Sequence, residues 1–140
     1  VPTYLGFREI PVFRPIIEEL DEDAILMLDG NGILHPFGFG LASHIGVEFG
    51  MPSIGVAKSL LCGSTGERCS SIATPVMLNG KQVGAQLKTS ARAKPIYVSP
   101  GHIISMPGAV KITASASRLK IPEPIRLAHI EATAMRRAAL

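Results

Sequence analysis

Several residue types are scarce in this sequence of 140 residues, and the aromatic ones come first. There is no tryptophan, and aromatic residues make up 5% of the chain, so a hydrophobic core has to be built from aliphatic side chains and methionine. The hydrophobic fraction of 46% and the charged fraction of 18% exclude the composition of a disordered protein. The length suits one domain, residues 1–140, with a core of its own.

Cysteine is scarce too, and its pattern excludes two kinds of site. Cys62 and Cys69 form neither a CxxC motif nor a disulfide framework, and two cysteines so spaced are too few for a zinc site. This usage indicates a reducing, intracellular setting. We therefore expect a cytoplasmic protein.

Long apolar runs are missing as well. No run reaches the roughly 18–20 residues that a membrane span needs, and the N-terminus lacks the charged-then-apolar pattern of a signal peptide. We therefore expect no membrane partner. The sequence begins with Val1 instead of Met, directly in motif-like sequence, and this predicts an N-terminal truncation.

A small excess of positive charge is the first feature that concerns a partner. The net charge of +3 and the pI near 9.1 favour a polyanion without identifying one. Because modest basicity is common, the type of partner has to come from motifs.

The apolar pattern predicts an alternating α/β order. We expect helices over residues 7–20, 40–49, 106–119 and 125–139, strands over 24–28, 53–58, 74–78, 82–87 and 95–99, and a surface loop over 63–71. Pro11 and Pro15 predict that the first helix starts only near Pro11 or bends at Pro15, because proline lacks a backbone donor. The pair Asn79-Gly80 predicts a hairpin turn. The strand–loop–helix–strand order of residues 24–58 implies two parallel strands joined by a right-handed crossover.

Four polar side chains stand out against this apolar background. They are Glu9 near the start of the first predicted helix, Asp29 and Lys58 at the ends of neighbouring predicted strands, and His129 in the last helix. Strand ends and adjoining helix starts can meet at one edge of an α/β sheet. Two carboxylates suit Mg²⁺, which keeps several waters, takes phosphate oxygens as ligands and generates hydroxide from bound water. Lys58 would then pair with a phosphate, and His129 would move a proton or hold the attacking water.

Each of these side chains also has a purely structural explanation. An Asp followed by Gly is typical of a turn, which would account for Asp29. Glu9 would stabilise the positive end of a helix dipole. Lys58 would be a solvated charge at a strand end, and His129 a structural residue on an amphipathic helix. The local sequence leaves these alternatives open.

Whole segments are more specific than single residues. They are GFRE (residues 6–9), LDGNGILHP (28–36), ASHIG (42–46), IGVAKSLLCG (54–63), SARAKPIYVSPGH (90–102) and PEPIRLAH (122–129). In this order, from the first residue to about His129, they closely resemble the endonuclease V family. The resemblance implies an RNase H-like mixed sheet flanked by helices. It also implies Mg²⁺-dependent cleavage on the 3′ side of inosine in DNA or RNA, with Mn²⁺ as a substitute ion.

The resemblance also assigns catalytic roles by position. Glu9 and Asp29 match the second and third catalytic carboxylates of the family, and both would hold the metal. His129 matches its C-terminal active-site histidine. Lys58 matches its phosphate-contacting lysine.

Residues that bind the substrate are implied in the same way. Leu5, Gly30 and Leu61 would line the pocket for the deaminated base, and His35 matches the histidine of the active-site loop. A pocket formed largely by backbone suits a base that has been turned out of the stack.

The sequence departs from the family pattern at its N-terminal end. The first metal-binding Asp of the family lies on an N-terminal strand, and no residue before Asp21 can supply it. Val1-Pro2-Thr3 aligns with the last three residues of a Tyr-Ile-Pro-Gly-like wedge, so the wedge tyrosine would precede Val1, and Tyr4 is a different position. We therefore expect a sheet without its N-terminal strands, weakened metal binding, and an exposed edge that favours a homo-oligomer.

Three functions follow from these observations. The first is an endonuclease for nucleic-acid repair. The second is a catalytically impaired fragment, or a non-catalytic module of the same fold that binds nucleic acid or protein. The third is a small-molecule binder, and it is disfavoured because Gly30-Asn31-Gly32 lacks the full GxGxxG spacing. Mg²⁺-dependent nicking of an inosine-containing oligonucleotide separates the first two.

Overall fold

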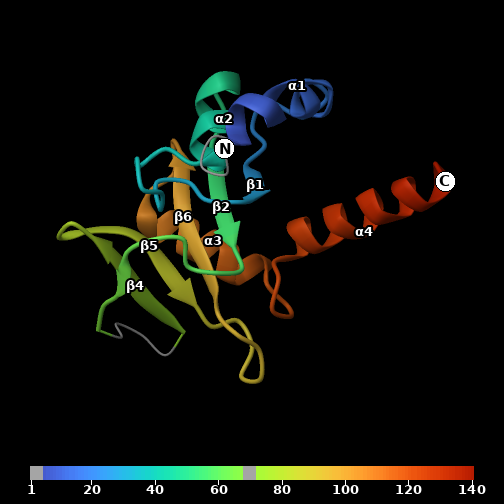
Figure 1. Ribbon diagram of the computed structural model, residues 1–140. Helices are drawn as coiled ribbons and strands as arrows, with labels where there is room; N and C mark the ends of the chain where they lie inside the picture. The colour runs from blue at the N-terminus through green and yellow to red at the C-terminus, as the bar shows by residue number, and fades with distance from the viewer. Residues whose placement is uncertain (1–4, 68–71) are drawn as a thin grey trace.

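A mixed six-stranded sheet forms the centre of this computed structural model, in which residues 5–67 and 72–140 are described (Figure 1). The strand order is β1-β2-β6-β5-β4-β3. The strands are β1 (Leu26–Asp29), β2 (Ser53–Ala57), β3 (Ser64–Thr65), β4 (Ala73–Leu78), β5 (Lys81–Leu87) and β6 (Ile96–His102). The helices are α1 (Leu5–Ile17), α2 (Leu41–Phe49), α3 (Met106–Ala116) and α4 (Glu123–Ala138). The predicted mixed α/β sheet flanked by helices is confirmed.

The parallel pair predicted near the N-terminus is present. β1 and β2 run parallel with Leu26 opposite Ser53 and Asp29 opposite Val56, and α2 forms the crossover between them. Gly50 ends α2 in the left-handed conformation, with a φ of 64°. The carboxyl ends of both strands therefore lie at the same end of the sheet.

The rest of the sheet is antiparallel. β2 pairs with β6, β6 with β5, and β5 with β4. Asn79 and Gly80 connect β4 to β5 with φ angles of 52° and 77°, as a type I′ turn requires of its two central residues. This confirms the predicted hairpin.

The core consists of two apolar clusters on opposite faces of the sheet. Leu26 and Leu28 of β1 belong to the cluster beneath α1 and α2, whereas Met27 between them packs against the other one. Because side chains alternate along a strand, the two clusters lie on opposite faces. The second cluster joins β2, β5 and β6 to α3 and, through Ile125, to the start of α4.

Several predicted boundaries were wrong. α1 begins at Leu5 and contains both Pro11 and Pro15, so the expected start near Pro11 is corrected. Ile10, Phe13 and Ile17 pack in the cluster with α2, and this burial maintains a helix that two prolines weaken. A two-residue strand, β3, occurs within the predicted 63–71 loop.

Two features of the surface bear on the sequence predictions. β1 is an edge strand, with β2 as its neighbour in the described sheet. α1 and α4 keep large apolar side chains exposed, among them Phe7 at 72%, and α4 projects away from the sheet (Figure 1).

Among the described residues, no helix is both long enough and apolar enough to cross a membrane. The expected wedge remnant Val1-Pro2-Thr3, Tyr4 and Cys69 lie outside the described residues.

Candidate active site

Asp29 and Lys58 meet where two parallel strands end. Asp29 is the last residue of β1, and Lys58 directly follows β2. The Nζ atom of Lys58 lies 3.9 Å from Oδ2 of Asp29, and the two side chains are 56% and 59% exposed. An ion pair this long and this exposed contributes little to stability, so the pair is open to exchange partners with a ligand.

The loop that follows Asp29 is held by its backbone. The N–H of Gly30 donates to the carbonyl of Val56 at 3.0 Å, and the N–H of Ile33 donates to the carbonyl of Pro100 at 2.9 Å. The N–H of Gly32 donates to Oγ of the buried Ser99 at 2.8 Å. Bonds to both β2 and β6 therefore fix the loop relative to the end of β1.

Glycines allow this loop to lie directly on the strands. A Cβ atom at Gly55 would stand 2.5 Å from the backbone nitrogen of Gly32 and 2.7 Å from the carbonyl oxygen of Gly30. A Cβ atom at Gly32 would collide with the carbonyl of Pro100. Backbone packs on backbone here, so the position of Asp29 is set by groups that have no rotamers to change.

His35 lies at the far side of the same loop. Its side chain is buried, with 4% of its surface exposed. Nδ1 accepts a hydrogen bond from the N–H of Phe37 at 3.1 Å, so a neutral ring carries its proton on Nε2. His35 thus stabilises the turn that closes the loop.

The structure does not bring all four predicted catalytic residues into contact. Glu9 is half-buried on α1, and His129 is exposed on α4. Glu9 lies beyond the first turn of α1, and no acidic residue occupies that turn, which argues against the helix-dipole explanation. The observed pairing is that of Asp29 with Lys58. The convergence of Glu9 and His129 on Asp29 stays a prediction.

A divalent cation fits Asp29 by the chemistry of its donor atoms. The carboxylate is exposed, and Mg²⁺ needs only one or two carboxylates when water and phosphate oxygens complete its shell. Across residues 5–67 and 72–140, no three His, Cys, Asp or Glu side chains are grouped so that they could hold a metal ion. Asp29 thus fits as one ligand of an ion whose other protein ligands are not gathered here.

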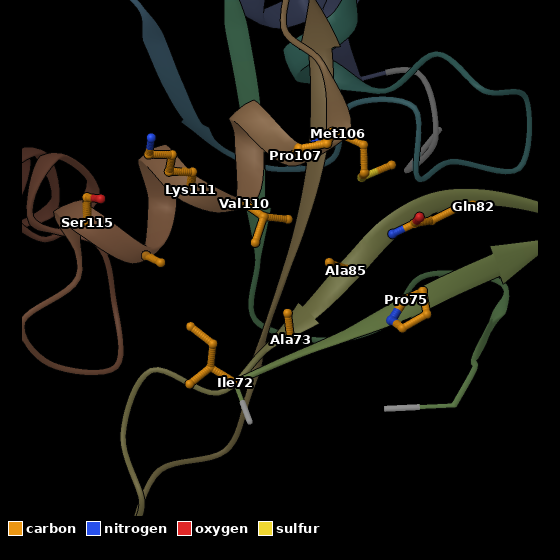
Figure 2. Close-up of a pocket in the computed structure, with 11 residues that line it drawn as sticks. Ile72, Ala73, Pro75, Gln82, Ala85, Met106, Pro107, Val110, Lys111 and Ser115 are labelled. Carbon is orange, nitrogen blue, oxygen red and sulfur yellow. The ribbon is translucent and has the colours of Figure 1, made fainter. Parts of the chain in front are cut away.

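Two of the predicted base-binding residues, Gly30 and Leu61, follow the carboxyl ends of β1 and β2. Gly30 is half-buried beside Asp29, and Leu61 is 46% exposed in the segment after β2. Leu5 begins α1. A cavity of about 570 Å³ lies elsewhere, between α3 and the β4–β5 hairpin, with mostly apolar side chains around it (Figure 2). Since β2 and β6 separate that hairpin from β1, this cavity is remote from Asp29.

Two residues of the loop's surroundings were missed by sequence reasoning. Ser99 lies within the segment 90–102 but gave no signal of its own, because its role depends on the pairing of β6 with β2. Asn31 keeps a buried side-chain oxygen that has no hydrogen-bond partner among the described residues. Its place between two glycines of the loop was visible in the sequence.

Comparisons with known proteins agree on one family. The family model described as Endonuclease V matches residues 1–130. The endonuclease V of Thermofilum pendens is 47% identical over 140 residues, which are 98% of this chain and 60% of that protein. That of Methanothrix thermoacetophila is 44% identical over 135 residues, or 93% of this chain and 60% of that protein. The chain therefore spans about 60% of the length of these relatives.

Solved structures support the same relationship. The endonuclease V of Streptomyces avermitilis matches with a TM-score of 0.87 and 34% identity, over 100% of this chain and 64% of that one. The Ciona intestinalis endonuclease V, in complex with a 24mer DNA containing an inosine followed by a ribo-adenosine, matches with a TM-score of 0.88. It is 27% identical, and the match covers 100% of this chain and 68% of that one.

Proposed function

The chain belongs to the endonuclease V family. We propose that Asp29 and Lys58, which we call the Asp29 corner, form part of the active site of a nuclease. This nuclease hydrolyses the phosphodiester bond 3′ to inosine in DNA or RNA. The observation that carries this proposal is the 3.9 Å pairing of Asp29 with Lys58 at the ends of two parallel strands. This distance supports the proposal, because a carboxylate that would hold a metal ion and a lysine that would pair with a phosphate have to lie within the width of one phosphate group.

The roles of the side chains follow from their charges. Lys58 pairs with a non-bridging phosphate oxygen, which replaces its long contact to Asp29. Asp29 would hold a divalent cation, Mg²⁺ with Mn²⁺ as a substitute. When bound, such an ion supplies hydroxide from water and stabilises charge on the phosphoryl group. Glu9 is proposed as a second carboxylate, and His129 as the residue that holds or deprotonates the attacking water.

Recognition of inosine is proposed to occur on the loop after Asp29. The loop is fixed through Gly30, Gly32 and Ile33, so its backbone groups keep their positions when a base enters. Leu5, Gly30 and Leu61 would surround the flipped base, and His35 would maintain the loop. A rigid frame reduces the entropy cost of reading a base that has already been unstacked.

Activity is tested on two forms of the protein. One is the 140-residue chain, and the other is the same chain extended by the preceding segment of the Thermofilum pendens relative. The substrates are a labelled oligonucleotide with one inosine and the matched one with adenosine, in DNA and in RNA form. We expect Mg²⁺-dependent nicking of the inosine strand, stronger in the extended protein, and its loss in EDTA.

Single substitutions assign the roles. Asp29→Asn should abolish nicking and Lys58→Gln should reduce it, whereas Lys81→Gln at the distant β4–β5 turn should leave it unchanged. Unchanged nicking in Asp29→Asn would remove that residue from the mechanism. Binding that persists in EDTA, with no nicking by either form, would favour the alternative of a non-catalytic or catalytically impaired binding module. Equal activity of both forms would refute the need for a further N-terminal strand.

Two predictions remain separate from this reaction. The edge strand β1 and the exposed apolar side chains of α1 and α4 support self-association, which light scattering during size-exclusion chromatography would detect. A cytoplasmic location stays a prediction, and cell fractionation tests it.

A further inference from the structure

Positive charge is distributed unevenly along this chain. From residue 72 to residue 122 the sequence contains seven Lys or Arg residues and no Asp or Glu. By contrast, residues 18–23 alone contain five acidic residues. A distribution this uneven produces a local field that the net charge of +3 conceals.

Five of these cations lie in two connections of the fold. The β5–β6 connection carries three exposed side chains, and the α3–α4 connection carries the exposed Arg118 and the half-buried Lys120. Thr89 of the first connection donates its hydroxyl to the carbonyl of Lys120 at 2.7 Å, so the two lie side by side. We call these residues the basic rim: Lys88, Arg92, Lys94, Arg118 and Lys120.

The basic rim continues the Asp29 corner of the sheet. In the β2–β6 pairing Ala57 lies opposite Tyr97, and β6 begins at Ile96. The β5–β6 connection therefore enters the sheet beside Lys58, which follows Ala57. In Figure 1 both connections lie at the end of the sheet toward which the β2 arrow points. Because β1 runs parallel to β2, its last residue, Asp29, lies at this same end of the sheet.

The acid nearest in sequence to the rim is already neutralised. Glu123 accepts hydrogen bonds from Arg126 at 2.6 Å and 2.9 Å. The Arg126 guanidinium, with smaller help from the charge of Arg118, lowers the pKa of Glu123. Glu123 thus stays ionised and is occupied by Arg126, so the rim keeps an excess of positive charge.

We propose that the basic rim binds the phosphate backbone of the nucleic acid next to the Asp29 corner and supplies affinity without reading bases. This inference rests on the proposed function for the nature of its ligand. Exposed Lys and Arg side chains suit phosphates, because they displace the counterions condensed on a polyanion and the release of these ions favours binding. A nucleic acid is favoured over an anionic membrane, because the rim adjoins the pair that would receive the scissile phosphate.

The test compares two double variants that remove the same charge. Arg92→Gln/Lys94→Gln neutralises two rim positions. Lys81→Gln/Lys111→Gln neutralises two exposed lysines elsewhere, one at the β4–β5 turn and one on α3. Lys81 begins β5 and Lys88 follows its end, so about 20 Å of strand separates Lys81 from Lys88. Far-UV circular dichroism and the melting temperature verify that both variants fold.

Binding is measured in EDTA by fluorescence anisotropy, on inosine-free duplex and single-stranded DNA, over a salt series. Each lost phosphate contact should lower the slope of log K against log salt by about 0.9 for duplex. We expect the rim variant to lose up to about 1.8 in slope and the control to retain the parent slope. Equal losses in both variants, or none in the rim variant, would overturn the proposal.

Two further outcomes separate this proposal from others. If the rim variant loses affinity for vesicles of phosphatidylcholine and phosphatidylserine but not for DNA, the rim is a membrane contact and the proposal is wrong. Because binding is measured without metal and without inosine, a loss of slope in the rim variant supports the rim even if no nicking is ever found. Nicking together with an unchanged slope overturns the rim and leaves the nuclease intact.

Discussion

Removing the hydroxyl of Ser99 should destabilise the loop that carries Asp29. Ser99 is fully buried, and its Oγ accepts the N–H of Gly32 at 2.8 Å. In Ser99→Ala the amide loses its acceptor in a place where Gly32 packs against the backbone of Pro100, which leaves little room for water. An unsatisfied buried donor costs about 1–3 kcal/mol.

Ser53→Ala is the matched control. Ser53 is also fully buried, and its Oγ donates to the carbonyl of Ala42 at 2.6 Å. That carbonyl lies in α2, where it also accepts the amide four residues later, so it keeps a partner when the hydroxyl is removed. We therefore expect a cost of about 1 kcal/mol, near the net value of one ordinary hydrogen bond.

Urea unfolding of both variants measures the difference. For a chain of this length, a loss of about 2 kcal/mol lowers the melting temperature by about 7 °C. Amide exchange at Gly32 should accelerate in Ser99→Ala and not in Ser53→Ala. A loss in Ser53→Ala as large as that in Ser99→Ala, or a loss below about 0.5 kcal/mol in Ser99→Ala, would refute the account of the orphaned donor.

Three more predictions concern other parts of the fold. Gly55→Ala should lower the free energy of unfolding by about 1–3 kcal/mol, as urea unfolding would measure. The reason is that the new Cβ meets backbone atoms of residues 30–32 that cannot rotate away. Arg126→Gln should raise the pKa of Glu123 toward its usual range, as NMR titration would detect. Since Arg126 lowers that pKa, its stabilising effect is present above about pH 4.5 and should fade as the pH falls through the lowered value. Partial burial raises the pKa of the Cys62 thiol, so iodoacetamide at pH 8 should alkylate it more slowly in the folded protein than in urea, by mass spectrometry.

The elements that sequence predicted well are those with strong local signals. The two short apolar runs before Asp29 and Lys58 became β1 and β2, because β1 packs apolar side chains against both core clusters and β2 is buried along its whole length. Gly50 marked the end of α2, since it tolerates a positive φ. The same local signals placed an acid and a lysine at neighbouring strand ends, which is why this half of the candidate site could be predicted.

The elements that sequence could not predict depend on tertiary contacts. Pro11 and Pro15 argued against a helix from residue 5, and burial against α2 outweighed them. The hydrogen bond by which Ser99 holds Gly32 depends on the register between β2 and β6, which no local pattern encodes. The positions of Glu9 and His129 relative to Asp29 depend on how α1 and α4 pack. Resemblance supplied their roles, and the described structure does not gather them into a metal-binding group.

Charge polarity connects the fold to the proposed binding mode. The acidic residues of 18–23 precede β1, so they lie toward the amino ends of the parallel strands, while the basic rim lies at the carboxyl ends (Figure 1). A polyanion is therefore repelled from one end of the sheet and attracted to the other, where Asp29 and Lys58 stand. The carboxylate of Asp29 by itself would repel a phosphate, and Lys58 together with the basic rim offsets that repulsion. The same field makes association faster at low salt, so the association rate of the rim variant should depend less on salt, while that of the matched control should keep the parent dependence.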